Sequence, residues 1–131
     1  MGDLFAAVAA AGELTIFAAL LGRAAGAALL HGPGPLTMFA PTDAAFGQLP
    51  ESVRAALHED AAALEALVLA HLAMGLVVAA DLMEQPFVAM AGGQTLAVDT
   101  ALGIRLHRAY LVRADILADN GVLHIIDSVL L

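Results

Sequence analysis

TMFAPTDAAFGQLP, residues 37–50, joins a short apolar run to the signals that start a helix. The apolar residues 36–40 predict a strand, and the Pro-Thr-Asp that follows predicts a helix start. Thr42 is placed to cap this helix with its hydroxyl, and Asp43 sets a negative charge against the positive end of the helix dipole. The stretch therefore predicts a strand followed at once by a helix.

Helical patterns surround this stretch in the front half of the chain. The Ala/Leu/Phe-rich segments 3–11 and 15–30 predict two helices, and Thr15 is a candidate N-cap for the second. Residues 50–57 predict another helix. Residues 60–71 predict a fourth, because their apolar positions follow the 3-4-3 spacing of a stripe that faces a core.

From Phe87 onward the apolar period changes from helical to alternating. The turn signals are AGGQT (91–95), DTALG (99–103) and ADNG (118–121). Residues 122–126 are apolar on both faces apart from His124, which is typical of a central buried strand. With no repeat or linker, the chain predicts a single α+β domain over residues 1–131.

The composition excludes several classes of protein. The chain has 131 residues, no cysteine, and 13 Asp plus Glu against five arginines, for a net charge of −8. The absence of cysteine excludes disulfides, thiol nucleophiles and Cys-ligated metals. The acidic balance argues against nucleic acid as a partner, because phosphate binding needs clustered cations. A hydrophobic content of 61% excludes a disordered chain.

The apolar stretches 4–22 and 66–80 raise the question of membrane association. Glu13 interrupts the first stretch, and the second is shorter than the roughly 20 residues that a spanning helix needs. Asp3 stands where a signal peptide would carry a positive charge. We therefore expect buried or half-buried helices in both stretches, and membrane association only through an anchor that this chain does not contain.

The titratable residues form no recognised catalytic or metal-binding motif. The five histidines never stand four residues apart, neither serine lies in a nucleophile elbow, and no phosphate loop is present. We expect no cofactor, no metal and no catalysis. The sequence leaves open whether Asp43, Asp115 and Asp127 converge in space. His71 lies on an apolar helix stripe, where a core role with backbone hydrogen bonds is the usual one.

Four segments together resemble the fasciclin domain. Residues 37–50 resemble its first signature box, and NGVLHIIDSVLL (120–131) resembles the second box, which closes the domain as its last strand. AHLAMG (70–75) resembles the Tyr-His box, although alanine replaces the tyrosine and methionine replaces a proline. AGGQTLAVDT (91–100) resembles the Gly-Gly hairpin that follows. The signature positions expected to be structural are Thr42, Asp43, His71, Asn120, Gly121, His124 and Asp127.

The resemblance implies a helical layer packed against a twisted, largely antiparallel sheet that forms a wedge or a sandwich. It also implies a non-enzymatic adhesion or interaction module that is secreted, periplasmic or at the cell surface, with a protein or glycan partner. The composition is typical of a bacterial member. In animal members, an Asp-Ile pair before the second box is associated with integrin binding, and Asp115 and Ile116 stand at the matching positions. A carboxylate can join a partner's metal or arginine, while the aliphatic neighbour adds contact area. The alternative is a carrier of a small apolar ligand, held between the Ala-rich helices and the sheet.

Overall fold

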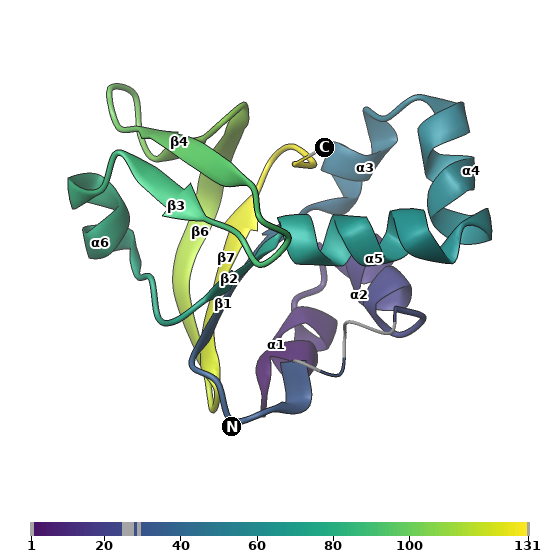
Figure 1. The fold of residues 1–131 in the computed structure, drawn as a ribbon, viewed down its shortest axis with the longest axis horizontal. Helices are drawn as coiled ribbons and strands as arrows, with labels where there is room; N and C mark the ends of the chain where they lie inside the picture. Colours follow the sequence, from purple (N-terminus) through teal and green to yellow (C-terminus); the bar gives the residue numbers. More distant parts are fainter. Residues whose placement is uncertain (1, 25–27, 29, 131) are drawn as a thin grey trace.

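A computed structural model describes residues 2–24, 28 and 30–130 (Figure 1). Within them the chain forms six α-helices and one seven-stranded sheet. The helices are α1 (Leu4–Ala10), α2 (Thr15–Leu21), α3 (Asp43–Gly47), α4 (Glu51–Glu59), α5 (Ala61–Ala70) and α6 (Ala79–Glu84). The strands are β1 (Leu36–Pro41), β2 (Leu72–Met74), β3 (Phe87–Ala89), β4 (Thr95–Asp99), β5 (Arg105–Leu106), β6 (Ala109–Ala118) and β7 (Gly121–Ile126).

The sheet has the order β2-β1-β7-β6-β5-β4-β3, and only β1 and β7 pair in parallel. The sheet curls, so that the turn after β3 returns to β2, where the Ala91 N–H donates to the Leu72 carbonyl at 2.7 Å. Helices α1 to α5 gather on one side of β1 and β7, while α6 lies on the other (Figure 1). The predicted α+β class with a largely antiparallel sheet is confirmed.

Strand β7 is the centre of the fold. All six of its residues are buried, and it lies between β1 and β6, as its two-sided apolar sequence predicts. One face, with Leu123 and Ile125, joins the larger core beneath the helices. The other face, with Ile126, joins a smaller core inside the curled sheet, together with Phe39 and Leu82. The two cores explain why this strand carries no exposed polar face.

Asn120 and Gly121 fix the start of this strand. The Asn120 carboxamide accepts from the Leu4 N–H at 2.9 Å and donates to the carbonyls of Leu30 and Gly32 at 2.6 and 2.9 Å. These bonds join α1 and the segment before β1 to the β6–β7 turn. At Gly121 a Cβ would stand 2.0 Å from the Leu36 carbonyl oxygen, so the parallel pairing of β1 and β7 requires glycine there.

Three local expectations were wrong. The helix expected over 15–30 ends at Leu21, because the chain leaves the helix at Gly22, and part of the remainder lies outside the described residues. The stretch 66–80 is not one helix, because α5 ends at Ala70, β2 follows and pairs with β1, and α6 begins at Ala79. Thr15 does not cap α2: its hydroxyl donates to Asp43 instead, at 2.6 Å.

Candidate functional site

His71 is a buried anchor at the end of α5. Its Nδ1–H donates to the Leu67 carbonyl at 2.7 Å, and its Nε2 accepts from the Leu130 N–H at 2.9 Å. Its ring packs against Phe17, with the ring centroids 5.7 Å apart. Burial lowers the pKa of His71 to about 4, because the charged ring would lose its hydration, and the Leu67 carbonyl opposes this shift. The ring is therefore neutral and has no free nitrogen for a ligand.

His124 is a second buried anchor, on β7. Its Nε2–H donates to the Val77 carbonyl at 2.7 Å, and its Nδ1 accepts from the Asp115 N–H at 3.1 Å. Its ring stacks on Phe39 with the centroids 5.3 Å apart. Burial lowers the pKa of His124, although the Val77 carbonyl and the Asp115 carboxylate oppose the shift. Both nitrogens are again committed to backbone groups.

Asp115 lies at an irregular point of β6, where the register to β7 shifts and its own φ is +59°. Its Oδ1 accepts from the Ala79 N–H at 2.9 Å, which holds the strand to the first residue of α6. The side chain is 48% exposed, and no described residue bonds its Oδ2. Half of this carboxylate is therefore fixed, and half is available to a partner.

Ile116 lies on the opposite side of β6 from Asp115. It is half-buried and packs against the larger core, on the α1 side, whereas the Asp115 carboxylate reaches α6. Together with Arg113 and Leu117 it lines one wall of an open groove of about 500 Å³, whose other wall is α1. The two neighbours in sequence therefore do not form one continuous patch. A partner that touches both side chains contacts both sides of this strand.

Thr42 and Asp43 join the starts of two helices. The Thr42 hydroxyl caps α3 by accepting from the Ala45 N–H at 3.2 Å, as predicted. Asp43 stands in the first turn of α3, and its Oδ1 also accepts from the Ile16 N–H at 2.8 Å, near the start of α2. This carboxylate therefore stabilises two helix N-termini, a role that its local sequence does not reveal.

The sequence left open whether Asp43, Asp115 and Asp127 converge, and in the structure each carboxylate accepts a hydrogen bond from a different element. Asp43 accepts from a backbone N–H of α2, and Asp115 accepts from one of α6. The Asp127 Oδ1 accepts from the Tyr110 N–H of β6 at 2.8 Å. Within residues 2–24, 28 and 30–130, no group of three or more His, Asp or Glu side chains is placed to hold a metal ion. In the same ranges no helix has the length and hydropathy needed to cross a membrane.

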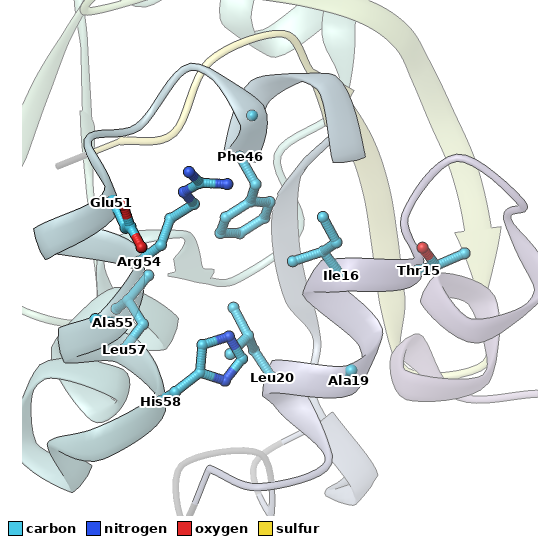
Figure 2. A pocket seen from close by; sticks show the side chains of 11 residues that line it. Thr15, Ile16, Ala19, Leu20, Phe46, Glu51, Arg54, Ala55, Leu57 and His58 are labelled. Atoms are coloured by element: carbon cyan, nitrogen blue, oxygen red, sulfur yellow. The ribbon is translucent and has the colours of Figure 1, made fainter.

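An apolar hollow of about 560 Å³ lies between α2, α3 and α4 (Figure 2). Leu20 and Phe46 are almost fully buried beneath it, and Ala19, Gly47 and Ala55 leave it open. The remaining residues that line it are Thr15, Ile16, Glu51, Arg54, Leu57 and His58. The sequence did not reveal this hollow, because the small residues that leave it open are far apart along the chain and form no local pattern.

Comparison with known proteins places the chain in one family. The fasciclin domain model matches residues 12–131. An uncharacterised protein of Synechocystis sp. is 37% identical over 103 residues, which cover 79% of this chain and 77% of that protein. Human periostin is 33% identical over 104 residues, which cover 75% of this chain and 12% of periostin.

The fold agrees with a solved structure. A pair of FAS1 domains from fasciclin I, an insect cell adhesion molecule, superposes with a TM-score of 0.82 at 15% identity, covering 99% of this chain and 51% of that chain. Fasciclin domains are generally non-enzymatic, largely extracellular adhesion modules. The four sequence boxes, the fold and the matched residues agree, and the chain belongs to the fasciclin domain family.

Proposed function

We propose that the protein is a non-enzymatic adhesion module that works outside the cytoplasm and binds a protein or glycan through the face around Asp115. The observation that carries the proposal is that only one of the two carboxylate oxygens of Asp115 is bonded to another described residue. One oxygen is held by the Ala79 N–H, so the group is oriented, while the other is unbonded among the described residues. A fixed carboxylate binds a cation or a partner's arginine at a lower entropic cost than a mobile one.

The surroundings of Asp115 add apolar contact area. Leu76 and Met83, on the segment before α6 and on α6 itself, are 51% and 57% exposed. On the other side of β6, Leu117 is 60% exposed beside the groove that Ile116 lines. A carboxylate with exposed aliphatic neighbours is the pattern of a small interaction surface with a polar anchor. Ile116 would add apolar contact area from the other side of β6, where it lines the groove against α1.

The test is binding to arrays of extracellular proteins and polysaccharides, with Kd then measured for each ligand found. Asp115→Asn is the sharp variant, because the amide oxygen still accepts from Ala79 and asparagine tolerates the positive φ. We expect it to weaken binding about tenfold or more, as for loss of a charge-assisted bond. Asp119→Asn, on the same hairpin and exposed, is the matched control and should bind normally.

Two further variants separate the sides of β6. Ile116→Val trims the α1 groove with little effect on packing, and Leu117→Ser alters the exposed neighbour. A chelator distinguishes a bridging cation, whose removal abolishes binding, from an arginine contact, which is unaffected. Normal binding by Asp115→Asn and Ile116→Val would reject this face as the site while leaving the family membership standing.

A further inference from the structure

The hollow between α2 and α4 has the size and lining of a small-molecule site. Its volume of about 560 Å³ lies inside the usual range for such pockets, roughly 300–1,000 Å³. The two helices meet at their C-terminal ends, where Arg23 beyond α2 donates to the ring Nδ1 of His58 on α4, at 2.8 Å, and to the His58 carbonyl, at 2.5 Å. Away from this contact a space remains between the helices, since the small side chains of Ala19 on α2 and Ala55 on α4 do not fill it.

The opening carries an arginine that no other described residue engages, in a protein that is acidic overall. Of the five arginines, Arg105 is paired with Asp99, Arg113 with Glu13, and Arg23 with His58. Arg54 has no hydrogen bond or ion pair to any described residue, and its guanidinium extends from α4 across the opening toward Phe46 (Figure 2). Glu51 also lines the opening but forms no ion pair with Arg54.

These observations define the ligand. An apolar floor favours an aliphatic or aromatic body. An arginine with no partner among the described residues favours an anionic head group at the mouth, which it can bind through two parallel N–H donors. The lining carries one cation, Arg54, and one carboxylate, Glu51, in a chain whose net charge is −8, and Arg23 bonds another lining residue, His58. A neutral apolar ligand would leave Arg54 unused, and a cationic ligand would lie against its positive charge.

We propose that this hollow binds a small organic anion, with its apolar body between α2 and α4 and its carboxylate on Arg54. The ligand is a free monocarboxylate rather than a membrane lipid, because a volume of about 560 Å³ between α2, α3 and α4 suits one short chain better than two long acyl chains. This activity is separate from adhesion, since the lining residues belong to α2, α3 and α4 and include none from β6 or α6.

The experiment is isothermal titration calorimetry with octanoate, and with 1-octanol as the neutral compound of equal chain length. We expect one octanoate per chain, and 1-octanol weaker by about tenfold or more, as for loss of a charge-assisted bond. Arg54→Gln should weaken octanoate by a similar factor, and Glu51→Gln should tighten it by removing the competing charge. Arg108→Gln removes the other arginine without a described partner, far from the hollow in sequence, and should bind normally.

Two further experiments test the location of the ligand: a substitution that fills the hollow, and NMR mapping of the residues that octanoate affects. Ala55→Leu places a larger side chain in the hollow on a helix that accepts it, and should abolish binding without unfolding the protein. Backbone NMR shifts on adding octanoate should cluster on α2 and α4, and Asp115→Asn should bind octanoate normally.

Four outcomes would overturn the proposal: equal affinity for 1-octanol, normal binding by Arg54→Gln, shifts confined to the α1–β6 groove, or binding to phosphatidylglycerol vesicles but not to octanoate.

Discussion

The Nε2 atom of His71 accepts a hydrogen bond of 2.9 Å from the backbone N–H of Leu130, 59 residues further along the chain. The other ring nitrogen bonds the Leu67 carbonyl within the same helix. The ring thus ties the end of α5 to the residues that follow the last strand. Since one nitrogen must donate and the other must accept, only the neutral ring with its proton on Nδ1 satisfies both partners.

Acid should destabilise the fold through this ring. Burial lowers the pKa of His71 to about 4 in the folded protein, against about 6.5 in the unfolded chain. Between these values the unfolded chain binds more protons, so the stabilisation is fully present above pH 6.5 and is lost as the pH falls toward 4. The complete loss corresponds to about 3 kcal/mol. Urea unfolding at pH 7, 5.5 and 4.5 measures it.

His71→Leu separates this effect from other titrations. The variant is less stable at pH 7, because the Leu67 carbonyl and the Leu130 N–H lose their partner, but its stability should fall less steeply with acid. His107→Asn is the control for removing a histidine as such, because His107 lies in an exposed turn and asparagine tolerates its φ of +58°. An unchanged slope in His71→Leu would contradict the assignment. His124, whose pKa burial also lowers, contributes with the same sign.

The two buried histidines should hold opposite neutral tautomers. His71 donates from Nδ1 to a carbonyl, whereas His124 donates from Nε2 to the Val77 carbonyl and accepts at Nδ1 from the Asp115 N–H. Long-range ¹H–¹⁵N correlation NMR at pH 7 distinguishes a protonated from an unprotonated nitrogen in each ring. The same tautomer in both rings would refute these hydrogen-bond assignments.

Asp43→Ala should cost about 1–2 kcal/mol, at the upper end for a helix cap, because it removes the acceptor for the Ile16 N–H and a favourable charge at the start of α3. Asp43→Asn keeps an acceptor oxygen and should cost less. Thr15→Ala removes only the hydroxyl that bonds this carboxylate and should cost least. Thermal unfolding ranks the three variants, and a larger loss for Thr15→Ala than for Asp43→Ala would contradict this role.

Gly121→Ala should destabilise by about 3 kcal/mol or prevent folding, because its Cβ would stand 2.0 Å from the Leu36 carbonyl oxygen and force β1 and β7 apart. Gly12→Ala is the matched control: no atom lies within 4 Å of its added Cβ, and stability should change by no more than about 1 kcal/mol. Soluble yield and thermal unfolding report the difference. Equal stability of the two variants would show that the strands accommodate the methyl group.

Local patterns predicted the elements that depend on nearby residues. The cap at Thr42 reaches only three residues ahead, so the Pro-Thr-Asp sequence is enough to reveal it. The turns at 91–95, 99–103 and 118–121 follow from glycine and polar residues, and the structure has strands on both sides of each. β2 was missed because three residues carry too little periodicity to be distinguished from the end of a helix.

The candidate sites were harder to predict than the fold. Asp115 and Ile116 are neighbours in sequence, but a positive φ and a register shift turn the carboxylate toward α6 while the aliphatic chain packs toward α1. The hollow at Arg54 depends on the separation of α2 and α4, which no local pattern encodes. Asp43 acts on Ile16 from 27 residues away.

The sequence by itself determined the family, the α+β class and the central strand, since these follow from boxes, periodicity and hydrophobicity along the chain. Only the tertiary structure decided which polar groups meet: His71 with Leu130, Asn120 with Leu4, and Asp115 with Ala79. The physical reason is the parallel pairing of β1 with β7, which brings together segments about 85 residues apart. Contacts of that range depend on how the chain packs, and that packing also leaves Arg54 without a partner among the described residues, above an apolar floor.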